Sequence, residues 1–99
     1  MLEKLQIIQQ RFDEVSDLII QPDIIADQKR YIQLNKEYKD LKKLTERADA
    51  YKALLANQEE AEAIIKEGSD AEMIEMARMQ LEEAKSGIPI LEEEIKYLL

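Results

Sequence analysis

The sequence predicts an all-α fold: a long antiparallel coiled-coil hairpin with a third, N-terminal helix packed at one end. Three observations support this prediction. Apolar residues recur at steps of three and four along most of the chain. Only two glycines and two prolines are present, so few positions can end a helix. Charged residues make up 36% of the chain, which is typical of long helices with an aliphatic seam and a charged exterior.

The first helix is expected over about residues 2–20. Its apolar residues alternate steps of three and four and form one stripe, namely Leu5, Ile8, Phe12, Val15 and Ile19. Pro22 ends this helix, because the residue before a proline is pushed away from helical backbone angles. Residues 21–26 are therefore expected to be a short connection, and the Asp27 carboxylate can cap the next helix.

The second helix is expected over about residues 27–67. Its seam consists of Tyr31, Leu34, Tyr38, Leu41, Leu44, Ala48, Tyr51, Leu55, Gln58, Ala61 and Ile65. Leu44 follows Leu41 after three residues where four were due, and such a stammer overwinds a supercoil or changes the partner that the face meets. Gly68 supplies the stop, because glycine readily adopts the left-handed conformation beyond a helix end.

The third helix is expected over about residues 70–98 and has the most regular pattern. Its seam holds four heptads without a slip: Ile74, Ala77, Leu81, Ala84, Ile88, Leu91, Ile95 and Leu98. Ser69 and Glu72 have the spacing of a capping box, which leaves a connection of only a residue or two and forces antiparallel neighbours. Pro89 lies within the pattern and cannot make its helical hydrogen bond. Either the helix is kinked near Pro89 or two helices meet there, and the unshifted register favours the kink.

Charge placement agrees with an antiparallel hairpin. A turn at Gly68 and Ser69 puts the basic residues Lys39, Lys42, Lys43 and Arg47 beside the acidic run 92–94. Ile90 and Tyr97 lie seven residues apart on a face outside the seam, and we expect the N-terminal helix to cover them. Residues 1–99 are thus expected to form a single helical domain.

The chain lacks the residue types that several classes of function require. The chain has no cysteine and no histidine, so no disulfide, thiolate nucleophile, Cys/His zinc site or imidazole base is possible. No signal peptide and no apolar run of bilayer length are visible, and a cytoplasmic protein without membrane contact is the simplest expectation. We expect no enzyme, no cofactor and no metal site.

The net charge of −8 is unevenly distributed. Residues 57–99 hold twelve acidic and four basic side chains, which accounts for all of it and argues against phosphate-backbone binding there. Residues 29–52 hold eight basic and four acidic side chains, so contact with RNA is conceivable in this stretch. Its tyrosines could stack on bases, yet they fall on the apolar seam, where a tyrosine more often belongs to the core. Direct nucleic-acid contact is therefore not the favoured interpretation.

The remaining candidate groups gather around the turn between the two long helices. Glu59 and Glu62 share a helix face, but without a pocket they are expected to be solvated rather than to bind a metal. Met76 and Met79 point away from the seam; they are either an adaptable protein-binding patch or simply good helix formers on a surface. The candidate partner-contact tip consists of Glu59, Glu62, Glu72, Met76 and Met79.

Three segments together resemble a known family. They are PDIIADQKRY at 22–31, LNKEY at 34–38 with Leu41, and LEEEIKYLL at 91–99. In this order and spacing the chain resembles the N-terminal domain of bacterial class I peptide chain release factors, of the type that reads UAA and UAG stop codons. The family's Gly-Gly-Gln and Pro-x-Thr-type motifs are absent, so no catalytic or decoding residue can be transferred, and the chain resembles a first domain without those that follow.

The resemblance implies a role in translation termination. It implies contacts with the ribosome at the stalk base and with the class II release-factor GTPase, without identifying the residues involved. The alternative is a free-standing coiled-coil adaptor or oligomerisation module. Exposed Leu98 and Leu99 could also let the isolated chain associate with itself.

Overall fold

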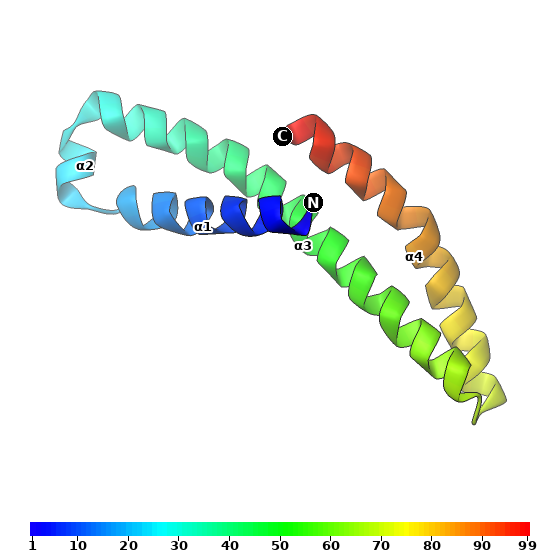
Figure 1. The fold of residues 1–99 in the computed structure, drawn as a ribbon. Coiled ribbons are helices and arrows are strands. Elements are labelled where there is room, and N and C mark those ends of the chain that lie inside the picture. The colour runs from blue at the N-terminus through cyan, green and yellow to red at the C-terminus, as the bar shows by residue number, and fades with distance from the viewer. The chain divides into compact units, whose positions relative to one another are not determined.

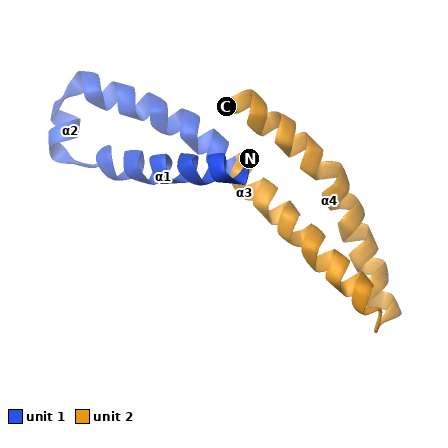
Figure 2. Ribbon diagram, viewed as in Figure 1, with its two compact units in different colours: residues 1–46 blue, residues 47–99 orange.

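The computed structural model describes residues 1–99 and contains only helices (Figure 1). They are α1 (Leu2–Leu18), α2 (Pro22–Ala26), α3 (Gln28–Glu67) and α4 (Ala71–Leu98). The chain divides into two compact units, Met1–Glu46 and Arg47–Leu99, which we call unit 1 and unit 2 (Figure 2). The predicted all-α fold, with α3 and α4 paired as a hairpin and a shorter N-terminal helix against α3, is confirmed.

Unit 1 is a small helical hairpin in which α1 packs against the first part of α3. Val15, Ile24 and Leu34 are its buried centre, and the partly buried residues packed around them are Leu18, Ile19, Tyr31, Tyr38 and Leu41. Residues 21–26 are not the plain connection expected, because α2 occupies most of them. Pro22 is preset for the first position of a helix, and burial of Ile24 holds this single turn in place.

The start of α3 follows the sequence pattern. The Asp27 carboxylate accepts a hydrogen bond from the Arg30 amide at 3.2 Å, which satisfies one of the free amides in the first turn. The predicted cap at Asp27 is therefore confirmed. Its backbone amide in turn donates to the Ile24 carbonyl at 3.1 Å and closes α2.

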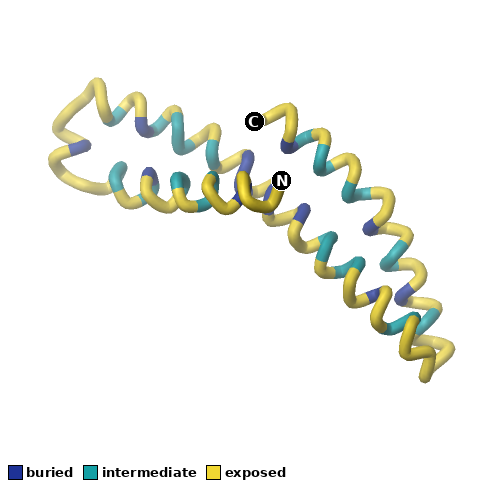
Figure 3. Tube along the Cα trace, viewed as in Figure 1, coloured by how far each residue is buried: buried dark blue, intermediate teal, exposed yellow.

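Unit 2 is the hairpin formed by the second part of α3 and by α4. Its buried residues are mostly alanines and follow the two predicted seams (Figure 3), with Ala48, Tyr51 and Ala61 on α3 and Ala77, Ala84 and Ile95 on α4. A Cβ atom placed on Gly87 would lie only 2.7 Å from Cδ1 of Leu54. The small residues therefore let the two helices approach closely.

The stammer in α3 lies next to the boundary between the units. Leu44 and Thr45 are buried, and unit 1 ends at Glu46. Within unit 1 α3 packs against α1, and within unit 2 it packs against α4, so the apolar face changes partner where the register slips. Of the two consequences expected from a stammer, the structure supports the change of partner.

The turn between α3 and α4 differs from the prediction in one residue. Gly68 has φ +67°, the left-handed conformation expected of it. The N-cap of α4 is Asp70 and not Ser69, so the predicted capping box is wrong. The backbone of Asp70 is extended, and its Oδ1 accepts from the amides of Glu72 at 2.9 Å and Met73 at 3.5 Å. A carboxylate also interacts more favourably than a hydroxyl with the positive end of the helix dipole.

Pro89 does not divide α4. The helix continues from Ala71 to Leu98 with Pro89 inside it, so the alternative of two helices with a break is wrong. Figure 1 shows α4 curved along its length rather than straight. A proline lacks the amide that would bond to the carbonyl four residues earlier, here that of Lys85, and such a gap favours bending.

Two expectations about surfaces have different outcomes. Arg47 Nε lies 2.6 Å from Glu94 Oε2, which confirms this expected pair within unit 2. The expected cover over Ile90 and Tyr97 is wrong, since these side chains are 61% and 90% exposed. The apolar stripe of α1 is already used against α3 inside unit 1, with Val15 fully buried there.

Candidate functional site

We call the end of unit 2 where α3 passes into α4 the hairpin tip, residues 58–79. The five residues that the sequence singled out lie here and are all exposed, namely Glu59, Glu62, Glu72, Met76 and Met79. Counted from the turn at Gly68, Glu62 and Met76 are about equally far along the two helices, as are Glu59 and Met79. The structure therefore places acidic groups of α3 and thioethers of α4 at the same end of the hairpin.

The carboxylates of Glu59 and Glu62 make no specific polar contacts. Ion pairs occur elsewhere in the chain, at Arg11, Arg47 and Lys96, and none involves Glu59 or Glu62. No group of three or more acidic side chains converges as a metal site would require. These carboxylates are thus free acceptors on an open surface.

Buried polar groups in the rest of the molecule are paired. Every buried side-chain nitrogen or oxygen has a hydrogen-bond partner, so no orphaned polar atom points to a missing ligand. None of the four helices combines the length and apolar character needed to cross a bilayer.

The methionines form a larger patch than the sequence pattern suggested. Met76 and Met79 are each 69% exposed, as expected for side chains that point away from the seam. Met73 is also exposed and was missed, although it stands one helical turn before Met76. Its spacing of three residues from Met76 was the available signal. Flexible, polarisable thioethers suit a surface that adapts to a partner.

At the other end of unit 2, polar contacts fasten α3 to α4. Arg47 pairs with Glu94, as described above, and buried Tyr51 lies near Glu92. Burial, and secondly the negative charge of Glu92, raise the pKa of the Tyr51 hydroxyl, so it stays protonated at neutral pH. These groups support the hairpin rather than forming a reactive centre.

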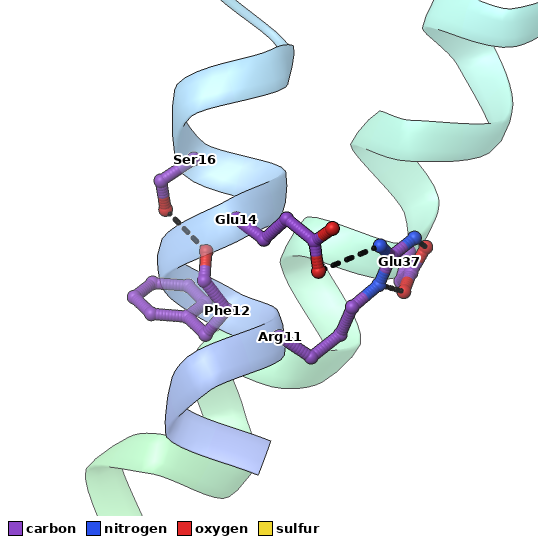
Figure 4. A network of polar contacts seen from close by, with 5 residues as sticks. All are labelled: Arg11, Phe12, Glu14, Ser16 and Glu37. Atoms are coloured by element: carbon purple, nitrogen blue, oxygen red, sulfur yellow. Dashed lines mark hydrogen bonds and ion pairs between the residues drawn. The ribbon is translucent and has the colours of Figure 1, made fainter. Parts of the chain in front are cut away.

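Unit 1 contains the most extensive polar network (Figure 4). The Arg11 guanidinium donates from Nε to Glu37 Oε1 at 2.5 Å and from Nη2 to Glu37 Oε2 at 3.0 Å. Its Nη1 also lies 3.2 Å from Glu14 Oε2. These hydrogen bonds lower the pKa of Glu37 and raise the pKa of Arg11. The network links α1 to α3 and keeps both partners charged.

The tyrosines of α3 belong to the packing of the helices. Tyr38 stacks on Phe12 of α1 with ring centroids 5.2 Å apart and an interplanar angle of 22°. Tyr31 packs against the core of unit 1, and Tyr51 is buried in unit 2. The interpretation of these rings as parts of the helix packing is confirmed.

Comparison with known proteins gives a family match over nearly the whole chain. Residues 8–99 match the PCRF domain family. The chain is 69% identical over 99 residues to peptide chain release factor 1 of Flavobacterium psychrophilum, and 63% identical over 99 residues to that of Flavobacterium johnsoniae. It is 52% identical over 98 residues to peptide chain release factor 1 of Bacteroides fragilis.

These alignments cover all or nearly all of the chain but only a part of each relative. All of this chain is matched in the two Flavobacterium proteins, yet it spans 28% of their length. In the Bacteroides protein 99% of the chain corresponds to 26% of the relative. No solved structure gives a significant match. The resemblance drawn from the segments at 22–31, 34–38 and 91–99 is confirmed.

Proposed function

The chain belongs to the PCRF domain family, and from this premise we propose that it works in translation termination as the N-terminal helical domain of a class I peptide chain release factor. The observation that carries the proposal is the identity of 69% to such a factor over all 99 residues. The segments at 22–31, 34–38 and 91–99 favour the type that reads UAA and UAG. The factor acts on ribosomes in the cytoplasm.

The domain serves as a docking element. Its partners are the ribosome at the stalk base and the class II release-factor GTPase, and the hairpin tip is the contacting part. The exposure of Met76 and Met79 and the unpaired carboxylates of Glu59 and Glu62 support this assignment. An acidic, thioether-bearing surface suits a protein partner with basic groups.

Catalysis belongs to another part of the factor. Residues 1–99 contain no Gly-Gly pair, and neither Pro22 nor Pro89 begins a Pro-x-Thr-type tripeptide. The relatives are more than three times as long as the matched region, since it spans 28% of the relative from Flavobacterium psychrophilum. Peptide release and codon reading are supplied by sequence outside this domain.

Binding measurements with tip variants test the docking role. Labelled chain is titrated separately with ribosomes stalled at UAA and with the class II GTPase. We expect Met76→Glu combined with Met79→Glu to weaken at least one interaction about tenfold or more, a loss typical of hot-spot residues. Ile7→Glu on α1 is the matched control, because Ile7 is equally apolar and 65% exposed but lies in unit 1. Unchanged affinity of the double variant for both partners contradicts the docking role.

Two further results separate this proposal from the free-standing adaptor. A Gly-Gly-Gln motif encoded downstream of Leu99 supports the release factor, whereas a natural stop codon directly after Leu99 supports the adaptor. The 99-residue chain alone should release no peptide from ribosomes stalled at UAA. Measurable release would overturn the assignment of catalysis to other domains.

A further inference from the structure

A row of exposed apolar side chains runs along α4 on the face that α3 leaves open. Met76, Ile90 and Tyr97 are separated by seven or fourteen residues, close to whole numbers of helical turns, so they lie nearly in line. Met79 stands one turn from Met76 and widens the row. All four are exposed, and Tyr97 almost completely. We call Met76, Met79, Ile90 and Tyr97 the outer stripe.

The outer stripe is distinct from the seam of the hairpin. The buried residues of α4 are Ala77, Ala84 and Ile95, and Ala77 lies about 100° around the helix from Met76. The outer stripe therefore remains free while the seam is covered by α3.

Charges on α4 are separated around the helix. Arg78, Lys85 and Lys96 are spaced by seven and eleven residues, so they form one line, about a third of a turn away from most of the outer stripe. The charged residues nearest the stripe are instead acidic, and all four are exposed without an ion pair: Glu72 and Glu83 lie within the row, and Glu75 and Glu82 lie along its edge. Negative charge therefore lies within the apolar row and along the edge that faces the bases.

We propose that the outer stripe binds a basic amphipathic helix of a partner protein, one whose apolar side chains recur at heptad spacing between Lys and Arg residues. From Met76 to Tyr97 the stripe is about 30 Å long, which matches a helix of about 20 residues. The Lys and Arg residues of such a partner helix complement the glutamates of α4. A second copy of this chain or a phosphate backbone would instead place negative charge against them. The inference rests on the proposed docking role and gives the chemistry of the partner.

Three synthetic helical peptides of about 20 residues test the inference with the 99-residue chain. The first carries Leu at heptad spacing flanked by Lys, the second the same Leu flanked by Glu, and the third the same Lys with Gln in place of Leu. We expect the first peptide to bind in fluorescence anisotropy, more weakly as salt is raised, and the others at least about tenfold less tightly. Ile90→Glu combined with Tyr97→Glu should weaken the affinity of the chain for the first peptide about tenfold or more. Ile7→Glu should leave this affinity unchanged.

Several outcomes would overturn the inference. Equal affinity for the first and third peptides would mean that the chain recognises only the positive charge of the peptide. Sedimentation velocity could show that the chain forms a dimer. If Ile90→Glu combined with Tyr97→Glu dissociates that dimer, a second copy of the chain, and not a partner helix, binds the outer stripe. If the chain binds ribosomes or the GTPase but not the first peptide, this inference fails while the docking role stands. If the first peptide binds the outer stripe but neither ribosomes nor the GTPase bind the chain, only the docking role fails.

Discussion

Arg11 and Glu37 join α1 to α3 by a bidentate ion pair, the geometry in which a guanidinium recognises a carboxylate best. Both side chains remain partly exposed, 40% and 36% respectively, so water weakens the interaction. The pair is therefore worth much less than a buried one. Its contribution depends on pH, because Arg11 holds the pKa of Glu37 below the ordinary value of 4.5.

Glu37→Gln should lower the free energy of unfolding by about 1 kcal/mol at pH 7. Since the pKa of Glu37 is lower in the folded state, the contribution is complete above pH 4.5 and is lost as pH falls through the folded pKa. Urea denaturation of both proteins between pH 7 and pH 2 measures the difference. Glu14→Gln, which removes only the contact within α1, is the control with the smaller effect. A difference that persists undiminished at the lowest pH would contradict the assignment.

Asp70 and Ser69 allow a direct test of the helix cap. Asp70→Ala should destabilise the chain by about 1 kcal/mol, because the amides of Glu72 and Met73 lose their acceptor. Ser69→Ala should change stability by no more than a few tenths of a kcal/mol, since its hydroxyl caps nothing. Thermal unfolding followed by circular dichroism at 222 nm compares the two. The reverse order of effects would restore Ser69 as the cap.

The close contact of α3 and α4 at Gly87 is a property of the two elements together. Gly87→Ala gains about 1 kcal/mol of helix propensity, but the added methyl group needs the space that Leu54 Cδ1 occupies. We therefore expect Gly87→Ala to be about 1 kcal/mol more favourable in a Leu54→Ala background than in the natural chain. A double-mutant cycle by urea denaturation measures this coupling. Additive effects would show that Leu54 moves aside without cost.

Long elements followed from the sequence, and short ones did not. The seams of α3 and α4 repeat over many turns, so Ala48, Ala77 and Ile95 were placed correctly in the core. The single turn of α2 has no period to detect, and burial of Ile24 decides its conformation. The cap of α4 was misplaced by one residue because Ser69 and Asp70 are both good caps, and only the geometry after Gly68 selects between them.

Helical periodicity predicted only part of the candidate site. Exposure of Met76 and Met79 follows from the helical period once the seam is known, and the structure agrees. Ile90 and Tyr97 were assigned to a second buried face because their spacing is also helical. Periodicity gives the direction of a side chain around its helix, but it does not say whether another element covers that direction.

At the scale of the whole molecule, a single helix serves two separate cores. α3 contributes Leu34 to the core of unit 1 and Ala61 to the core of unit 2. A continuous helix joins the cores covalently, yet its apolar face changes partner near Leu44. Because packing rather than helix propensity supplies most helical stability, each half of α3 should depend mainly on its own partner helix.

Hydrogen exchange of core variants tests this division. Val15→Ala removes fully buried methyl groups from unit 1 and should lower the protection of amides in α1 and in α3 up to Glu46, by about 2 kcal/mol. Ile95→Ala should lower protection in α4 and in α3 from Arg47 onward, by about 3 kcal/mol. Ile7→Ala, at an exposed position, should change neither region. If each core variant lowers protection equally throughout the chain, the two units unfold as one, and the stammer near Leu44 changes the partner of α3 without dividing its stability.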